Sequence, residues 1–198
     1  MRSLLLSIIV MAGSRSLTAQ WQVALLHGSA TSHGDARAEA DPDHPELHAE
    51  GPSTWLLAFA RDVGAWRIGA DLHRTTADLA EVGGSSSVTT RSVLAAWGAG
   101  IEVGRRIAGH AGAATLQASA GVRVDRWTFD LVETAPRTRV AAQGALSAQL
   151  PIGVQWSAVI RGEVTHGPSV FIADELPEGF SSRTATRLGM VLGVARRF

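Results

Sequence analysis

Three residues near the C-terminal end of the sequence could form a hydrolytic site: His166, Ser169 and Glu175. A serine that a histidine activates, with an acidic side chain to orient the histidine, is the arrangement of many acyl-transfer enzymes. Spacing along the chain does not place the nucleophile within hydrogen-bond reach of the base. We therefore expect no catalytic site here and keep hydrolysis as an alternative.

A second group of residues could bind a metal ion. His44 and His48 are four residues apart and have several acidic neighbours, and on a helix this spacing suits a divalent cation. Pro42 and Pro45 limit any helix in this segment. A solvated acidic loop is therefore the expected structure, and we predict neither a metal site nor a cofactor.

The composition narrows the choice of function. The chain has 198 residues, no net charge and no cysteine, so disulfides and thiolate metal sites are excluded. Without a basic excess, nucleic acid is not an expected partner.

The first 19 residues have the layout of an export signal. Arg2 precedes a short apolar run, and small and polar residues follow as far as Ala19. We predict cleavage after Ala19, so that residues 1–19 are a signal peptide and residues 20–198 form one domain. No later stretch is apolar for long enough to span a bilayer as a helix.

The remainder of the chain alternates between apolar residues and polar or small residues, the period of a β-strand whose two faces meet different surroundings. Eight segments show this pattern, and glycines within the alanine-rich segments favour strand over helix. The segments are 20–31, 53–61, 65–75, 89–103, 110–127, 139–150, 152–165 and 184–198.

The connections between these segments alternate in length. Short turns are expected at 62–64, at 104–109 and at Pro151, whereas long loops are expected at 32–52, 76–88, 128–138 and 166–182. Short turns at one end and long loops at the other are typical of membrane β-barrels.

The positions of the charges indicate which face meets lipid. In each segment, every second position is mostly apolar, and we call this set the apolar parity and the other set the polar parity. Arginines on the apolar parity lie near strand ends. A lipid-facing arginine costs about 0–1 kcal/mol there, instead of about 2–4 kcal/mol at mid-membrane. Aromatic residues near strand ends, such as Trp21, Trp66 and Phe198, suit an interfacial belt. In the alternative, a soluble exported barrel that binds an apolar ligand, the apolar face would point inward.

Charges of both signs lie deep within the segments on the polar parity. The interior of an eight-stranded barrel is just wide enough for side chains to fill, so these charges must pair with one another. We predict a side-chain-filled barrel without an open pore, and an interior network of Arg67, Asp71, Glu102, Arg123, Asp125, Arg161, Glu163 and Arg187.

With its signal peptide, eight strands, alternating loop lengths and terminal Phe198, the sequence resembles the small outer-membrane β-barrels of the OmpA/OmpX type. The resemblance implies an all-β, eight-stranded, antiparallel up-and-down transmembrane barrel in the outer membrane of a Gram-negative-type bacterium. It also implies that the barrel-assembly machinery recognises the last strand through Phe198, Val194, Leu192 and Met190. Arg196 departs from that signal, which has an apolar or aromatic residue at this position.

The His166 and Ser169 pair is similar to a feature of the outer-membrane lipid A deacylases, which carry histidine and serine two residues apart with an asparagine following. Here the spacing is three, and the chain has no asparagine. We predict a monomeric barrel with a structural or surface-interaction role, with outer-membrane lipid and lipopolysaccharide as partners. A lipid-modifying enzyme on the same architecture is the alternative.

Overall fold

The structure is a computed structural model that describes residues 20–38, 45–83, 86–110, 113–130 and 135–198. The predicted signal segment 1–19 and His44 lie outside the described residues. Within the described part of the chain, no helix is long and apolar enough to cross a membrane.

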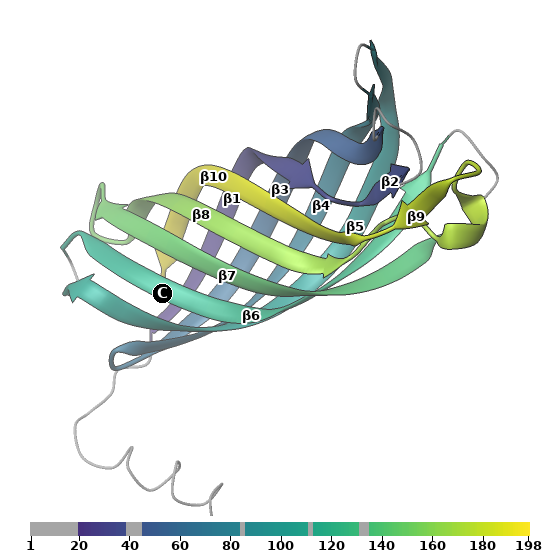
Figure 1. The fold of residues 1–198 in the computed structure, drawn as a ribbon. Helices are drawn as coiled ribbons and strands as arrows, with labels where there is room; N and C mark the ends of the chain where they lie inside the picture. Colours follow the sequence, from purple (N-terminus) through teal and green to yellow (C-terminus); the bar gives the residue numbers. More distant parts are fainter. Residues whose placement is uncertain (1–19, 39–44, 84–85, 111–112, 131–134) are drawn as a thin grey trace, which may run out of the picture.

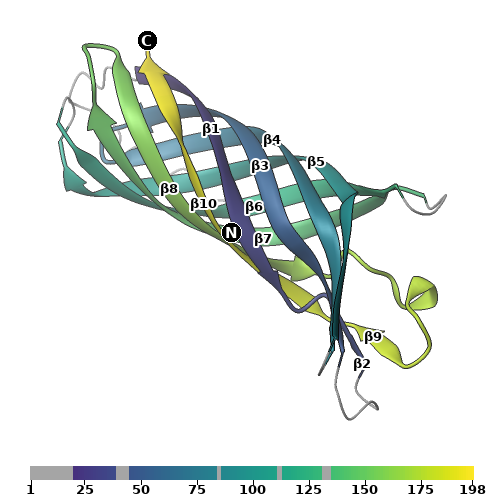
Figure 2. The same cartoon turned by 90° about the horizontal axis from the view of Figure 1, so that it is seen from above.

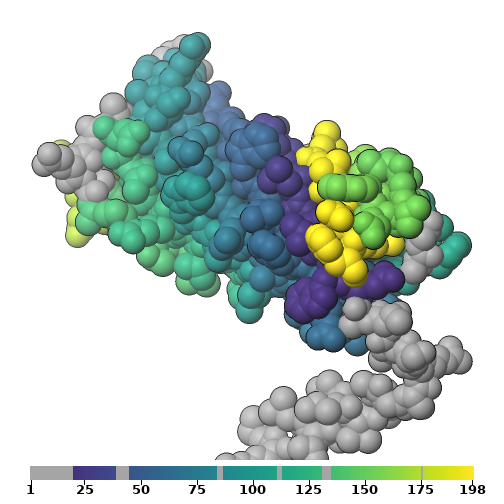
Figure 3. Space-filling model, turned by 180° about the vertical axis from the view of Figure 1, so that it is seen from behind, coloured from purple at the N-terminus to yellow at the C-terminus, as the bar shows by residue number. Residues whose placement is uncertain are grey.

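Eight long antiparallel strands form a closed barrel (Figures 1 and 2). The strand β1 pairs with β10 on one side and with β3 on the other, so the first and last long strands close the sheet. Figure 3 shows β1 in purple against β10 in yellow. The eight strands are β1 (Gln20–His33), β3 (Glu46–Val63), β4 (Trp66–Gly83), β5 (Ser86–Gly109), β6 (Thr115–Phe129), β7 (Arg137–Pro151), β8 (Trp156–Pro168) and β10 (Thr184–Arg197).

The apolar parity of these strands faces outward. Leu192 and Ile101 are 50 % and 63 % exposed, whereas Arg161 is 6 % exposed. Exposed apolar side chains over the whole wall are stable in a lipid bilayer but not in water. The transmembrane barrel prediction is confirmed, and the soluble barrel, which needs the opposite orientation, is contradicted.

Several strand boundaries differ from the sequence prediction. The strand β5 continues to Gly109 and β6 begins at Thr115, five residues later than predicted. The strand β8 begins at Trp156 instead of Ile152, because the N–H of Ile152 donates to the carbonyl oxygen of Trp156 at 3.0 Å and closes a turn. Apolar residues in this turn continued the two-residue alternation and concealed the boundary.

The predicted loops 32–52 and 76–88 are partly strand. The strands β3, β4 and β5 extend well beyond the predicted segments, and Figure 1 shows the β4–β5 hairpin projecting past the barrel wall. A bulge at Asp78 marks the start of this projection: its carboxylate accepts a hydrogen bond of 2.6 Å from the N–H of Ser92, which has a φ of 55°. Backbone pairing with neighbours supports these extensions, and so do inward apolar side chains such as Leu47, Ala49 and Ala77, which join a buried cluster.

Two short strands join the first and last long loops over one end of the barrel. The strand β2 (Ala36–Ala38) pairs with both β3 and β9 (Phe180–Ser182). A single 3₁₀ turn, η1 (Ala173–Glu175), precedes β9. Figures 1 and 2 show β2 and β9 side by side at the end opposite the C-terminus. The described parts of the first and last long loops are therefore joined by strand pairing at this end of the barrel.

Candidate functional site: a charged layer inside the barrel

The inward parity of five strands brings charged side chains together in the middle of the barrel. Arg161 on β8 donates two hydrogen bonds to Glu102 on β5, at 2.9 Å and 2.8 Å. Two parallel N–H···O bonds between a guanidinium and a carboxylate form the strongest ion-pair geometry available to side chains. Because β8 and β5 are not neighbours in the sheet, this pair connects separate walls of the barrel.

A histidine that the sequence analysis did not include lies at the centre of the layer. His73 Nδ1 is 3.0 Å from an oxygen of Asp71, and its Nε2 is 2.6 Å from an oxygen of Asp125. The Arg123 Nε group also contacts Asp125, at 3.1 Å. The signal for His73 was present in the sequence, since it has the same inward parity as Asp71.

Glu163 connects the two groups, with oxygens 3.4 Å from both Arg123 Nη1 and Arg161 Nε. Arg187 is 3.5 Å from Asp125 and stacks over Trp127, its guanidinium carbon 4.6 Å from the ring centroid. Three arginines therefore lie among four carboxylates, and His73 lies between Asp71 and Asp125 with its Nε2 also 2.8 Å from Arg123 Nε.

Arg67 lies apart from the other predicted network residues. It forms a bidentate pair with Asp62, at 2.6 Å and 2.9 Å, near the short-turn end of the barrel. The structure thus brings seven of the eight predicted residues into one connected cluster and gives the eighth a separate partner. Asp62 was placed in a turn by the sequence analysis, which is why this pair was missed.

An apolar cluster closes the long-loop end above the charged layer. Trp127, 1 % exposed, packs with inward residues of the strands and with residues of the last loop, including Val170 and Phe171. The buried Asp35 joins the two loops, because its carboxylate accepts hydrogen bonds from Ser32 at 3.0 Å and from Ser169 at 3.4 Å. Aliphatic, aromatic and hydrogen-bonded groups therefore lie together at the long-loop end.

Two small cavities adjoin the polar layer inside the barrel. One of about 40 Å³ lies beside Gln22, Gln149 and Arg161, and another of about 20 Å³ lies beside Arg123 and Arg187. Such volumes hold individual water molecules, which need roughly 10–15 Å³ each. They suit hydration of the polar layer better than binding of an organic ligand.

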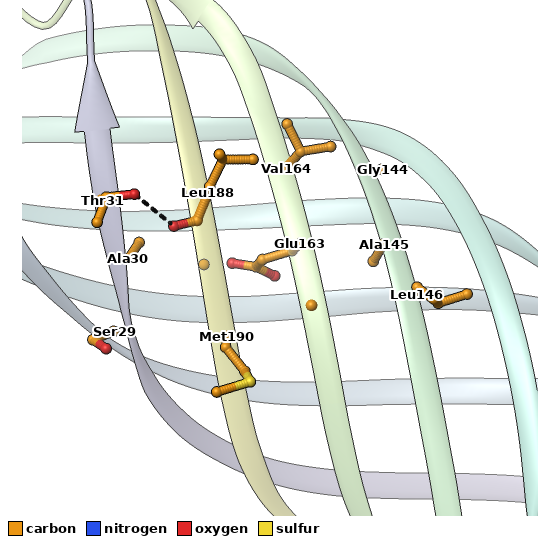
Figure 4. A pocket seen from close by; sticks show the side chains of 12 residues that line it. Ser29, Ala30, Thr31, Gly144, Ala145, Leu146, Glu163, Val164, Leu188 and Met190 are labelled. Carbon is orange, nitrogen blue, oxygen red and sulfur yellow. Dashed lines mark hydrogen bonds between the residues drawn. The ribbon is translucent and has the colours of Figure 1, made fainter.

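Larger hollows lie on the outer wall. One, of about 720 Å³, lies across β1, β10, β8 and β7. Figure 4 shows Leu188, Met190, Val164 and Leu146 among the side chains that line it. A second, of about 880 Å³, crosses β3, β4, β5 and β6 near the short-turn end. Both hollows face the region that lipid would occupy around a membrane barrel.

The candidate hydrolytic residues have separate partners. His166 is exposed on the outer wall, with Nδ1 2.9 Å from Thr186 Oγ1. Ser169 is buried, donates to Asp35, and accepts a hydrogen bond from the N–H of Phe171 at 3.0 Å. Glu175 lies in η1. Among the described residues, no hydrogen bond joins the serine to the histidine, so the geometry does not assemble a nucleophile and base.

The candidate metal ligand His48 lies on β3, opposite Ala80 of β4. Across the described ranges, no group of three or more histidine, cysteine and acidic residues is arranged to hold a metal ion. Its predicted partner His44 falls outside those ranges, so the pair itself stays a sequence hypothesis.

The four residues of the predicted assembly signal follow the outward parity of the last strand. Phe198, Met190, Leu192 and Val194 are all exposed on the barrel wall. The Phe198 N–H donates to the carbonyl oxygen of Trp21 at 2.9 Å, which attaches the chain end to the first strand. Arg196, where the signal would have an apolar residue, stacks over Trp156 and Phe198.

A closed eight-stranded barrel with an apolar outer wall and ionic groups enclosed has the fold of the small outer-membrane β-barrel proteins. No protein-family model matches the sequence, and no curated protein matches it. Solved structures share the fold at low sequence identity. Neisserial surface protein A aligns with a TM-score of 0.59 and 9 % identity, over 91 % of this chain and 97 % of that one.

Two further structures agree with this class. The outer-membrane protein OprG from Pseudomonas aeruginosa aligns with a TM-score of 0.62 and 8 % identity, covering 92 % of this chain and 97 % of that one. The attachment invasion locus protein Ail of Yersinia pestis was solved in complex with the heparin analogue sucrose octasulfate. It aligns with a TM-score of 0.51 and 9 % identity, over 91 % of this chain and 99 % of that one. The resemblance to small outer-membrane barrels is confirmed, and the predicted outer-membrane localisation agrees with this fold.

Proposed function

We propose that this protein is a non-conducting outer-membrane barrel with a β-platform at its long-loop end for contacts outside the cell. The platform consists of β2, β9 and the ends of β3, β4 and β5 that extend beyond the barrel wall. Two groups of side chains inside the barrel support the proposal. The Arg161–Glu102 pair connects separate walls, and the apolar cluster around Trp127 covers the mouth. The charged layer thus acts as a structural support for the barrel, and ion passage would require opening both layers.

A conductance measurement tests the closed interior. The purified barrel, reconstituted in a planar lipid bilayer, is expected to give no stepwise channel currents, whereas an open porin in the same bilayer gives them. Discrete, reproducible conductance steps from the wild-type protein would refute the proposal.

The platform has an edge strand that could receive a partner. The start of β5, from Ser86 to Thr90, pairs with β4, whereas β5–β6 pairing begins at Leu94. Among the described residues, no strand pairs with the other edge of this segment, and Val88 is 62 % exposed. An unpaired edge of this kind accepts an extended segment of another polypeptide as an added strand. Such a segment is the class of partner that the platform favours.

The absence of natural cysteine makes the orientation of the platform directly testable. Val88→Cys places a thiol at the long-loop end, and Val154→Cys places one in the exposed β7–β8 turn at the opposite end. A membrane-impermeant maleimide should label Val88→Cys on intact cells, but Val154→Cys only after the outer membrane is permeabilised. The reverse pattern would show that the platform faces the periplasm.

A further inference from the structure

Arginine and tryptophan side chains pair repeatedly on the outer wall at the short-turn end. Three such pairs are direct cross-strand neighbours: Trp21 with Arg61, Trp66 with Arg105, and Trp156 with Arg196. The guanidinium carbons lie 5.5, 5.7 and 5.6 Å from the ring centroids, within the range of cation–π contact. The pairs follow one another around six consecutive strands, β8, β10, β1, β3, β4 and β5.

These outward arginines have no acidic partner among the described residues, in contrast to Arg67, which pairs with Asp62 inside the barrel. A guanidinium in cation–π contact with an indole can still donate from its N–H groups, and these groups match the oxygens of a phosphate. The rim of the wall therefore presents fixed, uncompensated positive charge where lipid headgroups meet the barrel.

The groove of about 880 Å³ begins at one of these pairs. Trp21 and Arg61 line it at the rim, and a cross-strand row of Phe59, Ala70, Ile101 and Val122 lines it one row deeper in the wall. Ala70 is the smallest member of that row and lies between two bulky neighbours, Phe59 and Ile101. Ala70 and Arg61 line the same groove, and Glu102, the acidic residue in its lining, pairs with Arg161 inside the barrel.

The hollow in Figure 4 gives an internal comparison. It is of similar size and also lies on the outer wall, but none of its lining residues is an arginine, and its charged lining residue Glu163 pairs with Arg123 and Arg161 inside the barrel. An apolar hollow on a membrane barrel accepts acyl chains without distinguishing between lipid headgroups. The groove at Arg61 adds a charged group that can select among lipids by their headgroups.

We propose that this groove is a binding site for an anionic glycerophospholipid of the leaflet at the short-turn end. The phosphate contacts the guanidinium of Arg61, which Trp21 holds in place, and one acyl chain lies over Ala70 between Phe59 and Ile101. A second copy of this chain fits less well, because a two-fold interface would bring the same arginine-bearing rims together. The site depends on the barrel lying in a bilayer and is independent of any platform partner.

Lipid retention measured by native mass spectrometry tests the proposal. The purified protein is titrated in detergent with phosphatidylglycerol or with phosphatidylcholine of the same acyl chains. Wild-type protein should bind one phosphatidylglycerol in preference to phosphatidylcholine. Arg61→Gln should lower the affinity for phosphatidylglycerol about tenfold, the scale of one charge-assisted hydrogen bond. Ala70→Phe, which fills the hollow and keeps every charge, should lower it as well.

Two matched variants serve as controls. Arg74→Gln removes an outward arginine that stacks on Trp97 at 5.4 Å, outside the groove. Gly162→Phe adds the same bulky ring to the hollow of Figure 4, where Gly162 has open space. Both should bind phosphatidylglycerol as the wild type does. Heat-modifiable gel mobility establishes that each variant is a folded barrel before its binding is compared.

Three results would overturn the proposal. Equal affinity of the wild type for the two lipids would show that headgroup charge does not affect binding. Unchanged affinity in both folded Arg61→Gln and folded Ala70→Phe would place any bound lipid elsewhere. Equal losses in Arg74→Gln and Gly162→Phe would show that the wall binds lipid without a defined site.

Discussion

Arg161 and Glu102 form a two-pronged hydrogen bond across the barrel interior, with N–O distances of 2.9 Å and 2.8 Å. The two residues are far apart in the sequence and lie on β8 and β5, with β7 and β6 between them in the sheet. Their side chains are only 7 % and 12 % exposed. This pair connects strands that share no backbone hydrogen bonds, so it supports the shape of the barrel directly.

Arg161→Ala should destabilise the barrel strongly. The substitution leaves the Glu102 carboxylate buried without its main partner, and breaking one half of a buried ion pair costs about 3–5 kcal/mol. The free energy of unfolding, measured by urea titration in lipid vesicles, checks the prediction. Arg105→Ala, which removes an arginine from the outer rim, should cost about 0–1 kcal/mol. Equal losses of unfolding free energy in the two variants would show that the interior pair stabilises the barrel no more than an outer arginine does.

Gly98→Ala should destabilise the protein by crowding the charged layer. A methyl group at this position would collide with the side chains of His73 and Asp125, which are held by hydrogen bonds and cannot move freely. Overpacking of this kind costs about 1–3 kcal/mol. The same change at Gly162, where a methyl group meets open space on the outer wall, is the control. Folded yield by heat-modifiable gel mobility and the urea midpoint should fall for Gly98→Ala alone.

Trp127→Ala should weaken the layer over the barrel mouth. Trp127 is 1 % exposed and packs among the loop residues, and removing a buried aromatic side chain costs about 3–5 kcal/mol. Trp97→Ala is the control, because Trp97 is 64 % exposed on the outer wall. Protease digestion of the long-loop end should become faster in Trp127→Ala. Equal digestion rates in the two variants would mean that the loops hold their structure without this contact.

Deletion of Phe198 should slow assembly, as the predicted signal in the last strand requires. The deletion also removes the hydrogen bond from the Phe198 N–H to Trp21, at the seam where the barrel closes. Arg196→Phe brings the strand closer to the expected signal and should speed assembly. The rate at which heat-modifiable protein appears in vesicles that contain the barrel-assembly machinery measures both effects. If neither variant changes that rate, the residues of this strand do not act as a recognition signal.

The location of the charges was readable from the sequence, but their partners were not. Two-residue alternation assigns Arg161, Glu102 and Asp71 to one face, and the cost of burying charge in lipid decides that this face is the interior. Which carboxylate each arginine meets depends on the tilt and register of the strands around the closed barrel. A shift of register moves every cross-barrel neighbour without changing the alternation of a single strand.

The same distinction holds at the two ends of the barrel. Alternation in the sequence determined eight strands, their inward and outward faces and the order of short turns and long loops. Only the tertiary structure determined that His73 bridges Asp71 and Asp125, and that Asp35 and β2 join the last loop over the mouth. The preference of a side chain for water or lipid depends on its own residue type, so it can be read from the sequence. Contacts between distant segments exist only after the first and last strands have closed the sheet.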